Sequence, residues 1–584
     1  MTITRAFMAA SLMLATASTA WSQQASDTLA PERAAGSSAG GLVRAEKHMV
    51  VAANPLAAEA GLAILRQGGS AADALVAVQT TLGLVEPQSS GIGGGAFLVW
   101  YDAQSRTITT FDGRETAPKA ATGDLFLGED GQPLGFFEAV VGGRSVGVPG
   151  VPRLMETIHE RAGKLPWADL FAPAIALSRD GFEVSPRLSG LISSDSGRLD
   201  AQPSTKAYFH DADGTALAVG STLTNESYAD TLDALATGGA DAFYEGPIAD
   251  AIVAAVRDHP TNPGLLSADD FKDYRVIERD AVCAPYRDHE VCGMGPPSSG
   301  ALTIGQILGM VEPYEIGALG PDDPESWRII GDATRLAFAD RDRYMADSDF
   351  VDMPEGLLDA DYLTNRSALI RQPTALGQND VNAGDPPWKK AGLRIDGVDL
   401  SQPATTHFVI VDDAGNIASM TSSIENGFGA RLMVGGFLLN NQLTDFSFAA
   451  TGSDGPVANR VEAGKRPRSS MAPTIVLLDG EPRYALGSPG GSNIISYVAN
   501  TLIGLIDWDL DMAAAIARPH MVNRFGPYDI EVGTSAEDFA EDLAALGYEV
   551  EAKELNSGLH GIAFTPSGLE GAADTRREGV AVGD

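Results

Sequence analysis

Two threonines stand at the start of an apolar run in the sequence PATTHFVIVDDAGNIASMTSSIE, residues 403–425. The run has the pattern of two antiparallel strands joined by DDAGN, with Val411 opposite Ile417. Counting outward from that pair places Thr405 opposite Ser423, with both hydroxyls on one face of the sheet and close enough to hydrogen-bond. A slip by one residue would bring Ser422 there instead, again a hydroxyl. The ordinary β-propensity of threonine and serine accounts for the same residues without any chemistry.

A threonine in this position suits nucleophilic catalysis. Its hydroxyl is a poor nucleophile until a base removes the proton, and the α-amino group of the same residue can be that base. The pKa of an α-amine, about 7.7–8.0, lies near working pH, where a general base is most effective. The amine is released only if the Ala404–Thr405 peptide bond is broken. A long polar loop, 371–404, ends at this bond, and loops of that length are usually functional or cut.

A glycine pair offers candidates for stabilising a reacting carbonyl. Gly490 and Gly491 lie in RYALGSPGGSNIISYV, which has the pattern of a strand, a turn and a helix. Because they lack Cβ atoms, their N–H groups can approach a carbonyl oxygen at the helix N-terminus and act as an oxyanion hole. A plain strand-to-helix turn would have the same sequence.

Three further segments hold candidates for binding a charged substrate. In KRPRSSMAPTIV, Ser469 and Ser470 follow three basic residues, which suits a carboxylate, although a solvated loop would look the same. Arg114 in DGRETAP could make a bidentate carboxylate contact or pair with the aspartate two residues before it. Gln442 and Asp445 in LLNNQLTDFS could bind an ammonium group or cap a turn.

Two apparent motifs have the wrong surroundings. GSSAG, residues 36–40, matches the pattern of a nucleophilic serine, but small polar residues flank it where a strand and a helix are needed. GIGGGA, residues 91–96, resembles a dinucleotide fingerprint but leads from a helix into a strand, the reverse of the required order. We therefore expect no nucleotide cofactor.

The two cysteines, Cys283 and Cys292, flank APYRDHEV, a candidate hairpin. A disulfide closing this short loop and a pair of free buried thiols are both compatible with the sequence. The eight histidines show no ligand spacing with the cysteines or with one another, so we expect no bound metal.

The composition and the N-terminal residues limit the class of protein. The 78 acidic and 41 basic residues give a net charge of −37, which disfavours nucleic acid and anionic lipid as partners. Residues 1–22 have one charge, an apolar run and small residues at a cleavage position, as in a signal peptide. We expect a secreted, periplasmic protein that begins near Gln23.

The elements expected along the chain are those of an α+β protein. Helices are predicted at 57–66 and 71–81, a mostly helical region at 150–262, and strands at 276–294, 405–411, 417–423, 436–440, 473–478 and 482–487, with a helix from Asn493. These elements indicate one large domain with a central sandwich of strands and helices outside.

Taken together, these segments resemble the γ-glutamyltransferase family (γ-glutamyltranspeptidase, glutathione hydrolase). The likeness extends over almost the whole chain after residue 22 and includes NPLAAEAGLAILRQGGSAADA, VEPQSSGIGGGAF, GPPSSG, TTHFVIVDDAGN, GFLLNNQLTDFS, KRPRSSMAPTIV, GSPGGS and ADTRREGVAVG. It implies an N-terminal nucleophile hydrolase with a four-layer αββα sandwich. The precursor would cut itself before Thr405 into a large chain, 23–404, and a small chain, 405–584, which stay together as a heterodimer.

The resemblance also implies roles. Thr405 is the nucleophile that attacks first the Ala404 carbonyl and then the γ-amide of glutathione, and water or the amine of an amino acid or peptide takes the acyl group. The supporting hydroxyl and the oxyanion hole would be Ser423, Gly490 and Gly491. The residues implied for substrate binding are Arg114, Ser469 and Ser470 for the α-carboxylate, and Gln442 and Asp445 for the α-ammonium.

The chain departs from the family pattern in two places. Where many members have Thr-x-Thr-x-Asn, this chain has TSSIE, which puts Glu425 in the place of a neutral amide that helps bind the glutamyl end. The carboxylate could pair with the α-ammonium, or it could mark a related acylase. The segment between Gln442 and Ser469 is shorter than in members with a lid and has no tyrosine or tryptophan.

Two alternatives to a glutathione hydrolase follow. One is a cephalosporin- or glutaryl-type β-lactam acylase of the same family that uses the same Thr405. The other is an uncleaved, non-catalytic periplasmic binding protein. His407, close to the scissile bond, has no expected role beyond packing.

Overall fold

The computed structural model describes residues 40–377, 380–389, 395–396, 404–452, 455–524 and 526–584. The predicted signal peptide, nearly all of the segment 23–41, the serines of GSSAG and part of the loop 371–404 lie outside these residues. In the described part of the chain, no helix is both long enough and apolar enough to cross a membrane.

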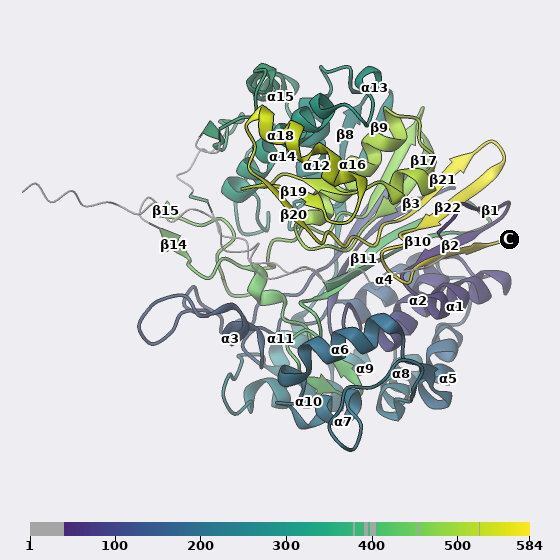
Figure 1. The fold of residues 1–584 in the computed structure, drawn as a ribbon. Coiled ribbons are helices and arrows are strands. Elements are labelled where there is room, and N and C mark those ends of the chain that lie inside the picture. The colour runs from purple at the N-terminus through teal and green to yellow at the C-terminus, as the bar shows by residue number, and fades with distance from the viewer. Residues whose placement is uncertain (1–39, 378–379, 390–394, 397–403, 453–454, 525) are drawn as a thin grey trace, which may run out of the picture.

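Two antiparallel sheets of seven strands form the centre of the molecule (Figure 1). The first has the order β23 (Val580–Gly583), β2 (Met49–Ala52), β10 (Ala404–Val411), β11 (Ile417–Glu425), β3 (Gly95–Asp102), β4 (Thr107–Gly113) and β7 (Ile277–Asp280). The second has the order β1 (Val43–Ala45), β22 (Gly568–Ala573), β21 (His560–Thr565), β17 (Glu481–Gly487), β16 (Thr474–Leu478), β9 (His289–Gly293) and β8 (Val282–Tyr286).

Strand β10 shows how alternation builds the layers. Phe408 and Ile410 belong to the core that the first sheet shares with its helices, whereas Val409 and Val411 belong to the core between the two sheets. Successive side chains of a strand point to opposite faces, so the apolar stretch 408–411 packs on both sides. The strand that carries the candidate nucleophile near its start is therefore an inner strand of the sandwich.

Helices cover the outer face of each sheet. The first core contains α1 (Pro55–Arg66), α2 (Ala71–Val85), α4 (Val151–Ala162), α5 (Ala172–Asp180), α6 (Pro186–Leu199), α7 (Pro203–Phe209), α8 (Glu226–Gly238), α9 (Asp241–Tyr244), α10 (Pro247–Arg257) and α11 (Ala268–Asp273). The second contains α12 (Gly300–Val311), α13 (Ile316–Leu319), α14 (Pro324–Tyr344), α15 (Ala360–Ser367), α16 (Asn493–Ile506), α17 (Met512–Ala517) and α18 (Ala540–Leu546). The expected αββα sandwich is confirmed.

Shorter elements connect these parts and belong to neither large sheet. They are α3 (Phe136–Val140), the 3-10 helices η1 (Trp167–Phe171), η2 (Glu355–Leu358), η3 (Ala368–Arg371), η5 (Gln442–Asp445) and η6 (Ser535–Phe539), and the strands β5 (Phe182–Glu183), β6 (Thr222–Leu223), β12 (Met433–Val434), β13 (Phe437–Leu438), β14 (Thr451–Gly452), β15 (Gly455–Pro456), β18 (Met521–Val522), β19 (Tyr528–Glu531) and β20 (Val550–Lys553). The strand predicted at 436–440 is thus only two residues long. It ends because the N–H groups of Asn440 and Asn441 donate to the carbonyls of Gly93 and Ile424 instead of continuing the ladder.

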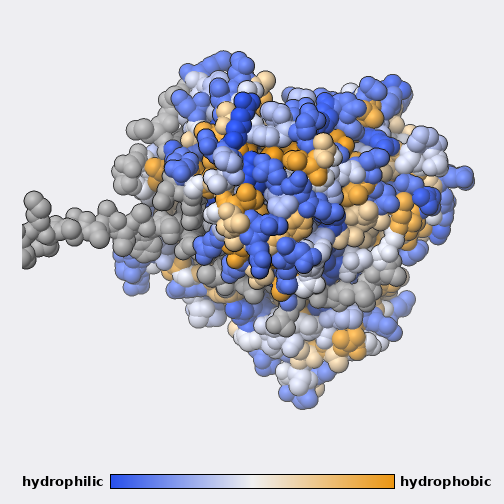
Figure 2. Space-filling model, turned by 45° about the horizontal axis from the view of Figure 1, so that its top comes forward, coloured by the Kyte–Doolittle hydropathy of each residue, from blue (hydrophilic) through white to orange (hydrophobic). Residues whose placement is uncertain are grey.

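Two other expectations concern the second sheet and the surface. Strands β8 and β9 form the predicted hairpin with Cys283 opposite Cys292, and of the two alternatives the structure has the disulfide. On the face drawn in Figure 2, hydrophilic residues predominate and apolar residues occur in scattered groups, as expected for the exterior of a chain with this charge.

Candidate active site

The two hydroxyls predicted to meet do so at the start of β10. Thr405 pairs with Ser423 across the strands, and the register predicted from the sequence is confirmed. Their Oγ1 and Oγ atoms are 3.2 Å apart, and both residues are buried. The ladder shifts between Ala404 and Thr405, so the regular pairing breaks at the bond that was predicted to be cut.

The hydrogen bonds of Ser423 determine the direction of its bond to Thr405. The Ser423 hydroxyl lies 3.0 Å from the Ala404 carbonyl oxygen, which can only accept, so the single Ser423 proton is donated there. Ser423 Oγ also accepts from the Glu425 N–H at 2.8 Å. Because its only proton is already used, Ser423 accepts from the Thr405 hydroxyl. The hydroxyls and the carbonyl therefore form a directed chain from Thr405 through Ser423 to Ala404.

A small cavity of about 30 Å³ adjoins Thr405 and gathers nearly all the candidate residues. Nine of the ten are in its lining and Gly490 is not. The lining residues are Arg114, Thr405, Ser423, Glu425, Gln442, Asp445, Ser469, Ser470, Met471, Gly491 and Ile494. Residues far apart in the sequence thus meet at the end of two strands.

The glycine pair forms a tight turn just before α16. Gly490 and Gly491 have φ angles of 136° and 58°, which side chains other than glycine rarely adopt. A Cβ on Gly490 would lie 2.7 Å from the ring of Tyr497, so the turn also has no room for one. Gly491 lines the cavity, and Gly490 lies next to it at the start of α16.

Arg114 lies at the end of β4 with its guanidinium in the cavity wall. The side chain is 1% exposed and donates to the backbone carbonyls of Pro467 and Arg468, each at 3.2 Å. Its charge pairs with the Asp445 carboxylate and not with Asp112, the partner considered from the sequence. Asp112 instead accepts a hydrogen bond from the Arg114 backbone N–H.

The serine segment reaches the cavity without its basic residues. The Ser470 hydroxyl accepts from Arg341 Nη2 at 2.7 Å, which leaves the Ser470 proton for another acceptor. None of the three cations expected from KRPRSS is in the lining. Lys465 pairs with Glu462, Arg466 with Asp112 and Arg468 with Asp342. The three cations therefore do not form a basic wall of the cavity, because an acidic partner takes up each charge, and two of these partners, Asp112 and Asp342, are buried.

Gln442 and Asp445 are the first and last residues of η5, and both line the cavity. Gln442 is fully buried, and neither its Oε1 nor its Nε2 has a hydrogen-bond partner among the described residues. A buried amide without a partner costs free energy unless a water or ligand completes it. Gln442 therefore marks a position where a polar ligand group fits.

Sequence reasoning missed Glu115, whose carboxyl is fully buried with an oxygen 3.9 Å from Arg114 Nη1. Burial raises the pKa of Glu115 to about 8, an effect that outweighs the nearby guanidinium. The carboxyl is therefore mostly protonated at neutral pH. The residue follows Arg114 directly, but nothing in DGRETAP indicates its burial.

Arg577 was also missed. It is fully buried near the C-terminus, and its Nη1 donates to the Thr405 carbonyl oxygen at 3.1 Å. The segment ADTRREG contributed only to the family resemblance, and its two adjacent arginines gave no sign of which one reaches the site. His407, by contrast, is outside the cavity lining, and its Nδ1 lies 2.9 Å from Thr421 Oγ1. Burial lowers the pKa of His407 well below its ordinary value, so the ring is neutral.

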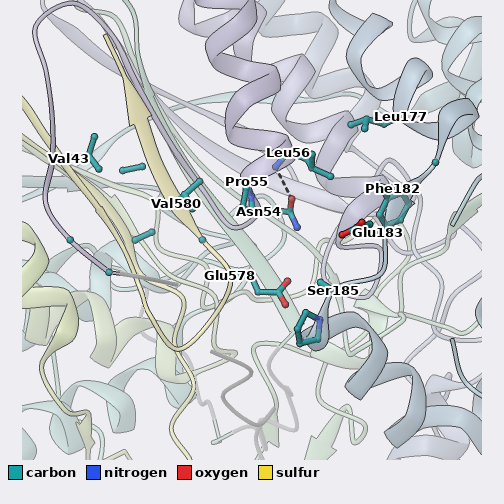
Figure 3. Close-up of a pocket in the computed structure, with 17 residues that line it drawn as sticks. Val43, Asn54, Pro55, Leu56, Leu177, Phe182, Glu183, Ser185, Glu578 and Val580 are labelled. Carbon is teal, nitrogen blue, oxygen red and sulfur yellow. Dashed lines mark hydrogen bonds between the residues drawn. The ribbon is translucent and has the colours of Figure 1, made fainter. Parts of the chain in front are cut away.

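A second cavity, of about 800 Å³, is larger than the one beside Thr405 (Figure 3). Its wall includes Asn54, Phe182, Glu183 and Glu578, and none of the candidate residues. Size alone therefore does not identify the site. For metals, the described residues contain one group of suitable ligand types, Cys283, Glu290 and Cys292, and both its sulfurs are in the disulfide.

Comparison with known proteins gives the family. Residues 57–584 match the family described as gamma-glutamyltranspeptidase. The glutathione hydrolase proenzyme of Bacillus subtilis (strain 168) is 34% identical over 548 residues, which cover 92% of this chain and 91% of the relative.

Acylases are among the similar proteins as well. The acylase ACY 1 proenzyme of Pseudomonas sp. (strain SE83) is 33% identical over 91% of this chain and 93% of its own. The crystal structure of cephalosporin acylase from Bacillus halodurans superposes with a TM-score of 0.80 and 25% identity, over 93% of this chain and 97% of that one.

Proposed function

Because this chain belongs to the γ-glutamyltranspeptidase family, we propose that it is a self-processed γ-glutamyl hydrolase and transferase that acts on glutathione and related compounds. The observation that supports this most is the cavity beside Thr405, which combines a hydroxyl pair, a guanidinium, two serines and two carboxylates. An amino acid head group carries one positive and one negative charge, and this set of side chains offers partners for both.

Maturation would use the chain of hydroxyls described above. Thr405 Oγ1 attacks the Ala404 carbonyl carbon and passes its proton to Ser423, while the Ser423 proton moves to the Ala404 carbonyl oxygen. The intermediate collapses as the C–N bond breaks and the nitrogen takes up a proton, leaving an ester on Thr405 and a free α-amine. Water then hydrolyses the ester. This step breaks the covalent link between the large chain, 23–404, and the small chain, 405–584, which stay together as a heterodimer.

In catalysis the new amine would be the base for the same hydroxyl. Thr405 Oγ1 attacks the γ-amide carbonyl, and the N–H groups of Gly490 and Gly491 stabilise the oxyanion. The amine leaving group departs with a proton, and water or an amino acid or peptide amine takes the acyl group. We propose Arg114, Ser469 and Ser470 as partners of the α-carboxylate, with Glu425, Gln442 and Asp445 as partners of the α-ammonium.

A β-lactam acylase of the glutaryl or cephalosporin type is the second candidate. It is supported by the acylase relatives and by Glu425, which stands where the family pattern has an amide. Both candidates require the same cleavage and the same nucleophile, so they differ only in the acyl group accepted. A non-catalytic, uncleaved binding protein would differ from both because it would remain one chain.

The test is a denaturing gel of the purified protein followed by N-terminal sequencing and an assay. We expect two chains, a smaller one that begins Thr-Thr-His-Phe, and release of p-nitroaniline from γ-glutamyl-p-nitroanilide. Thr405→Ala should stay a single chain. An active enzyme that is intact between Ala404 and Thr405, or a smaller chain with another first residue, would rule out this mechanism. Detection of the protein in a periplasmic extract would test the proposed export.

A further inference from the structure

The cavity of about 800 Å³ drawn in Figure 3 lies at one edge of the sandwich. Its wall combines the edge strands β1 and β23, the starts of α1 and α6, and the turn between α5 and β5. None of its lining residues lines the cavity beside Thr405. Sites for small ligands commonly have volumes of about 300–1,000 Å³. The cavity is therefore large enough for a ligand of its own, separate from the proposed nucleophile.

Much of this wall is apolar. Val43 of β1 and Val580 of β23 lie on one side of the cavity (Figure 3). Leu56 of α1, Leu177 of α5 and Phe182 of β5 lie on the other. Leu56 is 39% exposed and is among the large apolar side chains that the described residues leave open to water. An apolar group in the cavity would cover these side chains, and their removal from water favours binding.

Two carboxylates, and no basic side chain, line the cavity. Glu183 is exposed, and Glu578 is half-buried. Glu578 Oε1 accepts from the Arg187 N–H at 3.0 Å, which holds this carboxylate at the start of α6. The guanidinium of Arg187 pairs instead with Glu86, at 2.8 Å. The charge of the lining therefore favours a ligand with a cationic group.

Asn54 adds a hydrogen-bond donor. Its side chain is 7% exposed, and its Oδ1 accepts from the Leu56 N–H at 3.0 Å and caps α1. This bond fixes which end of the amide is the nitrogen. Among the described residues nothing accepts from Asn54 Nδ2, which in Figure 3 points into the cavity, toward the side where Glu183 and Glu578 lie. A buried donor of this kind favours a ligand with a carbonyl oxygen.

We propose that this cavity binds the free amino end of a short apolar peptide. The α-ammonium lies between the carboxylates of Glu183 and Glu578. The first peptide carbonyl oxygen accepts from Asn54 Nδ2, and the first side chain contacts Leu56 and Phe182. A simple cation would leave the amide and the apolar wall unused, and an uncharged apolar molecule would leave the carboxylates unused. The amino end of a peptide carries all three groups close together, and the inference does not depend on the proposed function.

The experiment titrates the purified full chain with L-leucyl-L-leucinamide by isothermal titration calorimetry. The N-acetylated form of the same peptide lacks the charge and should bind at least about 10-fold more weakly. Glu578→Gln keeps an oxygen for the Arg187 N–H and should weaken binding of the free peptide about 10-fold. Glu183→Gln should weaken it about 2- to 5-fold, because this carboxylate is exposed.

Two further variants complete the set. Asn54→Ser keeps an oxygen that can cap α1 but removes the donor, and it should weaken binding about 2- to 10-fold. Glu245→Gln is the matched control, since it makes the same change at an exposed glutamate outside the cavity lining, and it should not alter the affinity. Because Glu183 is exposed, Glu183→Gln should leave thermal unfolding unchanged, so that its weaker binding reports the cavity itself.

Three results would overturn the inference. The first is a full chain that does not bind the free peptide, whether because residues 23–39 or a second copy of the chain cover the cavity or because nothing binds there. The second is equal affinity for the free and the acetylated peptide. The third is wild-type affinity in both Glu183→Gln and Glu578→Gln, which would place the peptide elsewhere, for example beside Thr405.

Discussion

Replacement of Ser423 by alanine tests the chain of hydroxyls at the Ala404–Thr405 bond, where we propose self-cleavage. The change removes the donor to the Ala404 carbonyl oxygen, the acceptor for the Thr405 hydroxyl and the acceptor for the Glu425 N–H in one step. We expect the precursor to fold but to cut itself slowly. Ser423→Thr keeps the hydroxyl and should restore the rate to within about 10-fold, since the donor remains.

The magnitude follows from the role of the donor. In the proposed cleavage, negative charge develops on the Ala404 oxygen as Thr405 attacks, and loss of one donor to such an oxyanion costs about 10²–10³ in rate. The Glu425 N–H also loses its partner, which costs about 1–3 kcal/mol in the free energy of unfolding because the group is buried. Self-cleavage should therefore slow about 100- to 1000-fold while the protein remains folded.

The assay is a time course of freshly purified precursor, with the two products quantified on a denaturing gel and by intact mass. Ser422→Ala is the matched control, since that hydroxyl is on the adjacent residue of β11 and lies 3.4 Å from the Gly95 carbonyl, away from the cut bond. The reasoning is refuted if Ser423→Ala matures at the wild-type rate. It is also refuted if Ser422→Ala matures as slowly as Ser423→Ala.

Two further predictions concern buried charge. Arg577→Met should lower the free energy of unfolding by about 1–3 kcal/mol and slow self-cleavage, because it leaves the buried Thr405 carbonyl oxygen without this donor. Urea denaturation and the same time course measure this, and a variant as stable as wild type would contradict it. Burial lowers the pKa of His560 to about 3, so the folded state stays unprotonated while the unfolded state binds a proton below about 6.5. Its contribution to the free energy of unfolding is full above pH 6.5 and is lost as the pH falls, by about 1.4 kcal/mol per pH unit. In His560→Gln, the slope of the free energy of unfolding against pH should decrease by up to this amount between pH 6.5 and 5. An unchanged slope would contradict the conclusion that His560 is buried in its neutral form.

The hydroxyl pair and the layered fold could be predicted because they depend on local periodicity. Alternation along 405–411 and 417–423 and a short loop between them define one register, and that register places Thr405 opposite Ser423. The turn at Gly490 and Gly491 could also be predicted from neighbouring residues, since only glycine readily adopts the positive φ angles found there. Each of these inferences needs only neighbouring residues and standard strand or turn geometry.

Only the tertiary structure decided which charged side chains pair and which buried groups have a shifted pKa. Arg114 pairs with Asp445, 331 residues away, while the aspartate beside it in sequence serves other partners. The basic residues of KRPRSS are each paired outside the cavity lining, and Arg577 reaches Thr405 across 172 residues. Electrostatic energies depend on distance and on exclusion of water, neither of which adjacent residues specify. The sequence thus determined the strand of the proposed nucleophile and its partner hydroxyl, and folding determined which charged groups lie around them.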